Sequence, residues 1–365
     1  MRKFLRILLL LSNIVVAVLL MLACLCCYIS PKTIWWISFF GLAYMYLLAA
    51  NLCFLVIWAL SRKKKLILIS LVSILIGWPF IGRHVQLFDK KISENDIDKS
   101  LMVLTYNVQG FAQRNEAQPD GKKGDLFEFI RSTDADIICM QEFMTSQWEK
   151  DISEKNIRKQ LSKTPFIQVE LSIGTSGIAT FSKYPIIRKE LIYSDNTTNA
   201  CMYCDLVISS DTIRVYNIHL KSIGFNYDEW QLLNNTIKTD YNESDVQTFK
   251  AIFRQMIASF YSRAQQVEIV SSHIAQSPYP VIICGDFNDP PTSHSYQKVR
   301  NNKKDAFIEA GSGISTTYNI GSISSQRIDY ILYSDIFKAY NYESPRLFLS
   351  DHFPVMCRLV RSTDN

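Results

Sequence analysis

Three apolar stretches occupy most of the first 82 residues, and they constrain the fold more than any other feature of the chain. They cover residues 5–29, 34–60 and 66–81, and a membrane-spanning helix needs about 17–25 apolar residues. The first stretch also fits a cleaved signal peptide or a lipoprotein signal ending at Cys24, an alternative that the two later stretches weaken. The sequence therefore predicts a membrane region with about three transmembrane helices at 1–82, a polar linker at 83–99 and a separate domain at 100–362.

Basic residues near these stretches predict how they are oriented. Arg2, Lys3 and Arg6 flank the first stretch, and the basic run at 62–65 separates the second from the third. Because cytoplasmic segments carry an excess of Lys and Arg, three spans would place the domain outside the cytoplasm. If the third stretch only lies on the membrane surface, the domain is cytoplasmic instead. We expect a multi-pass integral membrane protein with an extracytoplasmic domain.

Charge is distributed unevenly along the chain. Residues 1–90 hold ten of the 39 Lys and Arg residues but one of the 34 acids, which leaves 29 basic and 33 acidic residues, a net −4, for 91–365. Domains that wrap nucleic acid are usually basic. The balance therefore weighs against long DNA as the substrate, although it does not exclude nucleic acid.

Short apolar runs bounded by turn residues predict strands at 101–106, 136–140, 176–182, 201–209, 213–220, 281–284, 326–332 and 355–360. The runs at 176–182 and 201–209 are expected in one sheet. Helical periodicity predicts helices at 124–132 and 249–275, with a loop or insertion at 223–248. Because helices separate only some of the strands, we expect an α+β fold with two packed mixed sheets flanked by helices.

Polar side chains recur where the predicted strands end. Burying such groups costs several kcal/mol unless they are paired or bind a metal, so their repetition indicates a site. The oxygen-bearing members of this set are Asn107, Glu142, Asp286, Asn288, Asp329 and Asp351. Since Mg²⁺ prefers oxygen ligands, Asn107, Glu142 and Asp351 are the expected metal ligands, with Mn²⁺ as an alternative ion.

Two of the five histidines, His219 and His352, lie beside predicted strand ends, whereas His273 and His294 are expected at the surface. A catalytic histidine needs a partner that fixes its tautomer, and Asp329 is the candidate partner of His352. The alternative for Asp329 is a structural ion pair with Arg327. In the Asp286-x-Asn288 segment, two polar side chains on one side of an extended chain could hold one substrate group. The alternative for this segment is a turn.

Six of these segments, in this order, resemble the endonuclease/exonuclease/phosphatase superfamily over about residues 100–360. The segments are Asn107-Val108-Gln109-Gly110, Gln141-Glu142, His219, Gly285-Asp286-Phe287-Asn288, Arg327-Ile328-Asp329-Tyr330 and Ser350-Asp351-His352. The resemblance implies a four-layered α/β sandwich with the site at one end of the two sheets. It also implies P–O bond cleavage with Mg²⁺.

The resemblance assigns a role to each site residue. Glu142 resembles the principal metal ligand, with Asn107 and Asp351 beside it. His352, oriented by Asp329, resembles the histidine that activates water or contacts the scissile phosphate, and Asp286 and Asn288 resemble the pair that aligns nucleophile and phosphate. His219 resembles the second histidine of the DNase I and sphingomyelinase branches, which argues against an apurinic endonuclease.

The substrate stays open between three alternatives. A membrane tether and an acidic domain favour a lipid or headgroup phosphate, as phosphodiester or phosphomonoester. A membrane-tethered nuclease acting on DNA or RNA is the first alternative, and a catalytically silent binding protein is the second. Phe225, Tyr227 and Trp230, just after His219, could contact lipid or stack on bases, or could be the partly buried aromatics of a surface loop.

Overall fold

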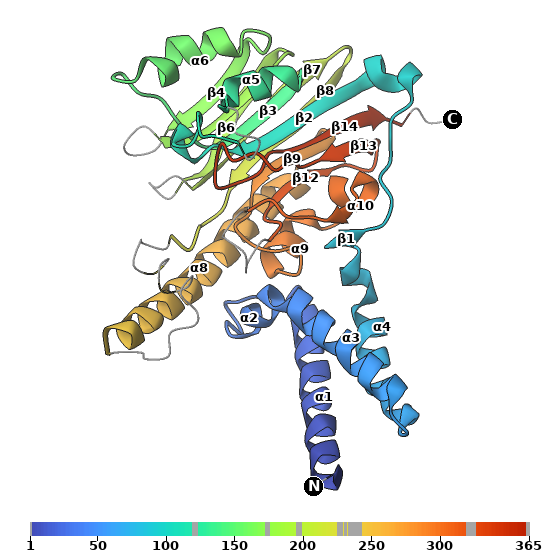
Figure 1. The fold of residues 1–365 in the computed structure, drawn as a ribbon. Helices are drawn as coiled ribbons and strands as arrows, with labels where there is room; N and C mark the ends of the chain where they lie inside the picture. The colour runs from blue at the N-terminus through green and yellow to red at the C-terminus, as the bar shows by residue number, and fades with distance from the viewer. Residues whose placement is uncertain are drawn as a thin grey trace.

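Two six-stranded mixed sheets packed face to face form the centre of the domain (Figure 1). The computed structural model describes residues 2–118, 123–171, 176–194, 199–224, 229, 232, 243–318 and 326–362. The first sheet has the order β13 (Phe337–Glu343), β14 (Val355–Arg361), β2 (Ser100–Asn107), β3 (Ile137–Met144), β5 (Ser176–Ser182), β4 (Phe166–Leu171). The second has the order β10 (Lys304–Asp305), β12 (Asp329–Tyr333), β9 (Val281–Asp286), β8 (Asp211–His219), β7 (Ala200–Ile208), β6 (Ile186–Ser194).

Helices cover the outer face of each sheet, which makes four layers and confirms the expected α+β sandwich. Between the sheets, Val103 and Cys139 of the first pack against Val215 and Ile282 of the second. The first sheet is covered by α5 (Leu126–Ser132) and α6 (Glu154–Gln160), and the second by α8 (Glu243–Ala275) and α9 (His294–Arg300). The smaller elements are α10 (Ala306–Ala310), the paired strands β1 (Val85–Gln86) and β11 (Gly313–Ile314), and 3-10 helices at Lys64–Leu66, Glu94–Lys99, Gln109–Phe111 and Lys150–Ile152.

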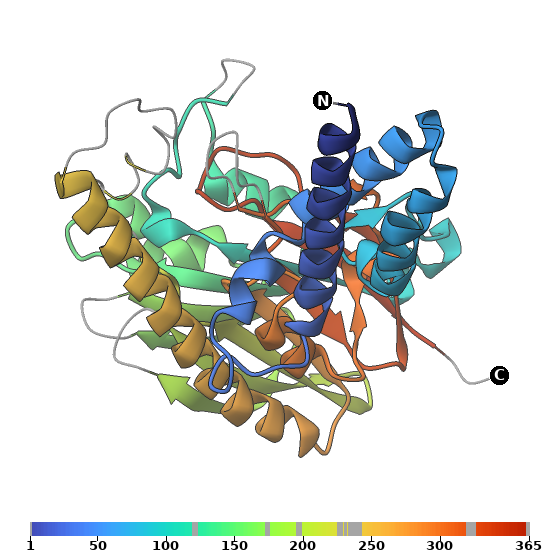
Figure 2. The same cartoon turned by 90° about the horizontal axis from the view of Figure 1, so that it is seen from below.

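The N-terminal region forms a separate group of helices below the sandwich (Figure 1). It consists of α1 (Arg2–Leu25), α2 (Ile37–Leu42), α3 (Tyr44–Leu60) and α4 (Ile67–Ile81). Among the described residues, the helices Lys3–Leu25 and Lys64–Ile81 are long and apolar enough to cross a membrane, and Tyr44–Leu60 is a shorter apolar helix. Seen from below, α2 lies between α1 and α8 (Figure 2).

The helices contact the sandwich at the loop that follows β9. The Thr292 hydroxyl donates to the Gly41 carbonyl (2.9 Å), and the Cys26 thiol donates to the Thr292 carbonyl (2.5 Å). Arg83 donates to the Pro291 carbonyl (3.0 Å), and the next residues form β1. The segment expected as a plain linker therefore carries a strand, a 3-10 helix and part of this junction.

Several sequence-based expectations are wrong in detail. The runs at 176–182 and 201–209 belong to different sheets, because β5 pairs with β3 whereas β7 pairs with β8. The apolar stretch at 34–60 is broken at Ala43, between α2 and α3. The predicted loop at 223–248 ends in helix, since α8 begins at Glu243, where acidic residues in the first turn favour a helix N-terminus. His273 is half-buried against Tyr203 and Tyr216, so it is not a surface residue.

Candidate active site

The fully buried carboxylate of Asp286, the last residue of β9, is the centre of the site. Its Oδ2 accepts hydrogen bonds from the side-chain amides of Asn107 (3.0 Å) and Asn288 (3.2 Å), and its Oδ1 accepts one from the Asn288 backbone (2.8 Å). The Nε2 atoms of His219 and His352 lie 3.7 and 3.6 Å from Oδ2. Residues from β2, β8, β9 and the segment before β14 therefore converge on one carboxylate, as the sequence motifs predict.

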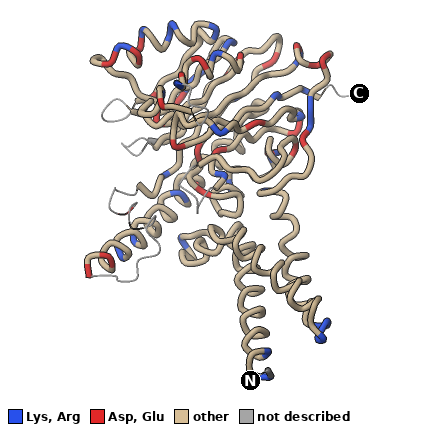
Figure 3. Tube along the Cα trace, viewed as in Figure 1, with Lys and Arg blue, Asp and Glu red and all other residues tan. Residues whose placement is uncertain are grey.

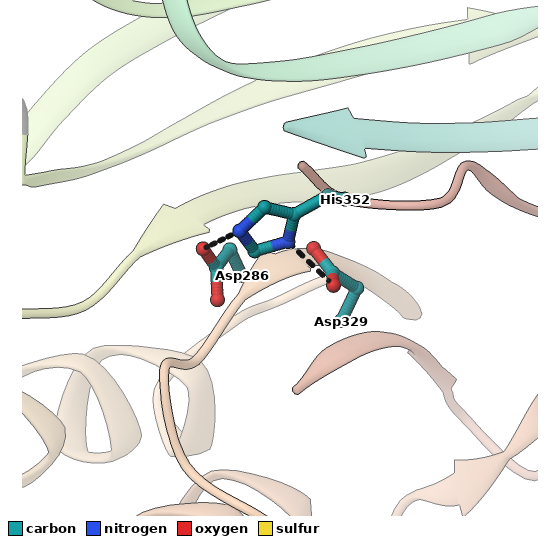
Figure 4. A group of neighbouring side chains, drawn as sticks. All are labelled: Asp286, Asp329 and His352. Atoms are coloured by element: carbon teal, nitrogen blue, oxygen red, sulfur yellow. Dashed lines mark hydrogen bonds and ion pairs between the residues drawn. The ribbon is translucent and has the colours of Figure 1, made fainter. Parts of the chain in front are cut away.

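His352 is held by Asp329 on its other side (Figure 4). The imidazole Nδ1 lies 2.9 Å from Asp329 Oδ2, and both side chains are almost fully buried. The antiparallel register of β12 and β9 places Asp329 directly opposite Asp286, so the histidine lies between two carboxylates. Burial by itself would lower the pKa of His352, but Asp329 and Asp286 outweigh it and raise that pKa to about 10. The imidazolium is therefore the favoured form at neutral pH.

The predicted alternative for Asp329 is wrong, because Arg327 pairs with a different acid. Its guanidinium donates to both carboxylate oxygens of Asp305 (3.0 and 2.8 Å), inside the second sheet. Asp329 therefore pairs with His352, and the backbone N–H of Asp329 donates to the Thr317 hydroxyl (3.0 Å). The carboxylate is thus positioned by main chain and by strand register, independently of the neighbouring arginine.

Glu142 lies within β3, whereas the sequence had placed it where the predicted strand ends. Its φ of 50° marks a bulge, and the register of β3 against β5 shifts between Gln141 and Phe143. Its Oε1 accepts from Asn107 Nδ2 (3.2 Å) and lies 3.8 Å from His219 Nε2, while the side chain stays 31% exposed. Glu142 is consequently the carboxylate of this group that is open to an incoming ion or substrate.

Asp351 is half-buried beside this group, and Ser350 links it to Asn107. Its carboxylate accepts from the Ser350 hydroxyl (3.3 Å), and that hydroxyl also bonds the Asn107 carbonyl (2.7 Å). Burial raises the pKa of Asp351, and the charges of Glu142 and Asp286 add to the rise although His352 opposes it. The three predicted metal ligands thus share one neighbourhood, with Asn107 and Glu142 in direct contact.

Gly285, the second-last residue of β9, permits the sharp turn of the chain between β9 and α9. Gly285 has a φ of 146°, and a Cβ there would collide with the backbone of Ile218. Asn288, with a φ of 50°, donates from its side chain to the Leu220 carbonyl (3.0 Å), one residue beyond His219. Asn288 therefore makes the predicted turn and also ties the end of β8 to the end of β9.

Several residues that support the site were given no role by the sequence. Gln141 donates to Asn217 (2.7 Å), which donates in turn to the Met140 and Ala179 carbonyls (3.2 and 2.9 Å), so the pair joins the two sheets beneath the site. The ring of Tyr318 lies 4.6 Å from the His352 ring, and burial together with the nearby acids raises the pKa of its hydroxyl. Gln141 and Asn217 could have been identified from the sequence, because each is a polar residue inside an otherwise apolar strand. Tyr318 lies outside every predicted strand and helix and had no such signal.

Two groupings of these residues could hold a divalent cation. Within the described chain, Asp286, Asp329 and His352 are the three His, Cys, Asp or Glu residues whose ligand atoms lie close enough together. That group is less suited to a cation, because Asp329 already binds one imidazole nitrogen of His352 and three amide N–H groups donate to Asp286. Glu142 fits a hard cation better, since its carboxylate is partly open to solvent and lies beside the buried amide of Asn107.

Comparison with known proteins places this geometry in context. A model of the endonuclease/exonuclease/phosphatase family matches residues 104–352, and a model of a domain of unknown function (DUF8431) matches residues 3–84. The comparison with curated proteins gives no match. An endonuclease/exonuclease/phosphatase from Beutenbergia cavernae is 14% identical over 72% of each chain, with a TM-score of 0.50, and supports the fold.

Two further solved structures are similar at slightly lower scores. A protein of the same family from Bacteroides thetaiotaomicron is 18% identical over 72% of this chain and 98% of its own, with a TM-score of 0.49. D. rerio TDP2, complexed with a single-strand DNA product, is 14% identical over 72% of this chain and 99% of its own, also with a TM-score of 0.49.

Proposed function

The chain belongs to the endonuclease/exonuclease/phosphatase family, and we propose that it is a divalent-metal-dependent hydrolase of phosphate esters acting at a membrane. Members of the family hydrolyse phosphate esters. The observation that carries the proposal is the convergence of His219 and His352, 3.7 and 3.6 Å away, on a buried Asp286. Two imidazoles provide hydrogen-bond donors for a phosphoryl group, and the fixed carboxylate beside them provides an acceptor for a proton.

The proposed reaction is in-line attack of water on phosphorus. Asp286 accepts the proton of the attacking water, and Asn288 holds that carboxylate in place. The P–O bond to the leaving group breaks on the opposite side, and the departing oxygen takes a proton from solvent. His219 and the imidazolium of His352 donate hydrogen bonds to the phosphoryl oxygens, whose negative charge grows in the transition state. Asp329 keeps His352 charged and oriented.

A divalent cation, Mg²⁺ or Mn²⁺, would be held by Glu142 and Asn107, with Asp351 close by. When bound, it supplies positive charge that stabilises the phosphoryl and leaving oxygens. The half-exposed carboxylate of Glu142 is what fits this assignment.

We propose that α1, α3 and α4 form a membrane-embedded bundle, because their polarity is inverted relative to a soluble protein. Asn13 donates to the Ser70 hydroxyl (2.7 Å) and accepts from the Trp58 indole (2.8 Å) in the interior, where Ser73 also donates to Asn51 (3.1 Å). The outside of the bundle is apolar, with large exposed side chains at Phe4, Leu8, Leu11, Val56, Leu68, Leu75 and Trp78. Polar groups inside and apolar groups outside are typical of helices packed in lipid.

The arrangement of charge supports an extracytoplasmic domain. Figure 3 shows basic residues at the start of α1 and between α3 and α4, at the end of the bundle that points away from the sandwich. Because basic residues favour the cytoplasmic side, the sandwich would lie on the opposite side. A domain held there, with a net charge of −4 over residues 91–365, favours a lipid or headgroup phosphate over long nucleic acid.

The test uses the full chain in lipid nanodiscs with Mg²⁺ and bis-p-nitrophenyl phosphate as a general substrate. The wild type should release nitrophenol, and His352→Ala should lose most of that activity while remaining folded. A panel of phospholipids, DNA, RNA and sugar phosphates then identifies the substrate class. Absence of wild-type hydrolysis on every phosphate ester would overturn the proposal, and hydrolysis of DNA or RNA alone would replace the lipid substrate with nucleic acid.

A further inference from the structure

The long helix α8 supports the active site with one of its faces. Arg263 donates to the Lys221 carbonyl (2.8 Å) and to the Asp289 carboxylate (3.2 Å), and Gln266 accepts from the Lys221 backbone N–H (2.8 Å). Lys221 comes two residues after His219, and Asp289 three residues after Asp286. The face of α8 that carries these buried side chains therefore fixes both loops that leave the active site.

A second face of α8 is apolar and exposed along the N-terminal half. Val246, Phe249 and Phe253 are 44%, 40% and 45% exposed. Their spacing of three and four residues places them on one side of the helix, in a row. A row of large apolar side chains exposed to water is unfavourable, and such a surface usually contacts another apolar phase.

This apolar row is continuous with the N-terminal helices. Phe253 stacks on Phe39 of α2, with ring centroids 4.9 Å apart, and lies 5.8 Å from the ring of Trp35. Figures 1 and 2 show α8 running down beside α2, with its N-terminal end on the side of the proposed membrane bundle. Next to this contact, Trp36 is itself 45% exposed, as is typical of side chains at a membrane surface.

Beyond the first turn, which carries Glu243 and Asp245, the charges of α8 fit phosphate headgroups. No Asp or Glu occurs between residues 246 and 267, and the exposed Lys250 and Arg254 lie beside the apolar row. A helix with an apolar face flanked by basic residues lies in the plane of a membrane, with the apolar side chains in the headgroup–acyl boundary. A water-exposed surface helix would not need this combination.

We propose that the N-terminal half of α8 lies in the headgroup layer of the bilayer, with Val246, Phe249 and Phe253 as its lipid contacts. The inference rests on the proposed membrane insertion of α1, α3 and α4, and it goes beyond the proposed hydrolysis. Because the other face of α8 holds the loops after His219 and Asp286, the helix sets the height of the active site above the membrane. The site would then stand within reach of phosphates at the lipid surface.

The test measures which phase surrounds α8 in the full chain reconstituted in phosphatidylglycerol–phosphatidylcholine nanodiscs. A nitroxide label is attached to Val246→Cys in a Cys53→Ser background, because the other described cysteines are buried. The matched control is Ile269→Cys, which is 46% exposed on the opposite side of the same helix. Collision with oxygen should exceed collision with a water-soluble nickel chelate severalfold at position 246, and the order should reverse at position 269.

A third label, Leu8→Cys on the exposed face of α1, separates the possible failures. Lipid-like accessibility at position 8 with water-like accessibility at position 246 overturns the α8 inference and leaves the membrane bundle intact. Water-like accessibility at both positions would also contradict the proposed membrane-embedded bundle. Spin–spin broadening at position 246 that disappears on dilution with unlabelled protein would show that a second copy of the chain contacts the apolar row. That result would overturn the proposal that the bilayer contacts it. Hydrolysis of bis-p-nitrophenyl phosphate, measured on the same samples, reports the proposed activity independently.

Discussion

His352 and Asp329 are joined by a hydrogen bond of 2.9 Å in a part of the protein that is almost fully buried. Burial disfavours a charged imidazole, and the paired carboxylate reverses that preference, so the pKa of His352 stands well above its ordinary value. The consequence is a histidine suited to donate to a phosphoryl oxygen, and less suited to remove a proton from water.

Replacing Asp329 with Asn tests this pairing. The substitution keeps the shape but removes the charge, so kcat should fall by about 10²–10⁴-fold, in line with the loss of one positioned acid–base group. Because the folded-state pKa of His352 is raised, the imidazolium persists until the pH passes that pKa, and Asp329→Asn should move the alkaline limb of the kcat profile to lower pH. An unchanged alkaline limb would contradict the assignment of His352 as a cation.

Glu142 is the side chain on which the proposed metal site depends most. Glu142→Gln removes the charge and keeps the size, so the Mg²⁺ concentration for half-maximal activity should rise by about 10–100-fold, as for other losses in metal shells. Glu154→Gln, on the exposed face of α6, is the control and should leave the Mg²⁺ titration unchanged. Equal Mg²⁺ dependence in both variants would exclude Glu142 as a ligand.

Asn217 is expected to matter for stability more than for catalysis. It accepts from Gln141 and donates to two carbonyls of the opposite sheet, so Asn217→Ala leaves several buried groups without partners. The cost should be about 1–3 kcal/mol of unfolding free energy for such unsatisfied groups. Thermal melting of the full chain in detergent should show a lower midpoint, with KM for bis-p-nitrophenyl phosphate little changed in the folded protein. A wild-type melting curve would show that water replaces the lost partners.

The residues of the site could be predicted from the sequence because each interrupts or ends an apolar run, which is an unusual place for a carboxylate or amide. The contacts that bring these residues together could not be predicted from the sequence. The bulge that turns Glu142 toward Asn107 depends on pairing with β5, and no local pattern specifies a strand partner. The separation of β5 and β7 into different sheets has the same cause. Phe225, Tyr227 and Trp230, the aromatic residues that the sequence offered for contact with lipid or bases, lie outside the described residues.

If α1, α3 and α4 cross the membrane as proposed, the orientation of their bundle predicts which side the domain occupies. Protease added to intact cells should degrade the sandwich, whereas the segment at 62–65 should be cleaved only in inverted vesicles. The physical reason is the basic charge at the end of the bundle that points away from the sandwich, because basic residues favour the cytoplasmic side. Full protection of the sandwich in cells, together with its cleavage in inverted vesicles, would reverse the topology.

Gly41 of α2 contacts the loop that leaves the active site, because its carbonyl accepts from the Thr292 hydroxyl. A Cβ at this position would lie 2.7 Å from the Thr292 carbonyl oxygen, which is too close for a backbone neighbour. Gly41→Ala should therefore displace the loop that begins at Asn288, lowering both the melting temperature and kcat. Gly77→Ala in α4 is the matched control, because its Cβ would meet side chains only at 3.6 Å, and alanine stabilises a helix interior by up to about 1 kcal/mol. If both variants kept wild-type kcat, the N-terminal helices would contact the domain without shaping its active site.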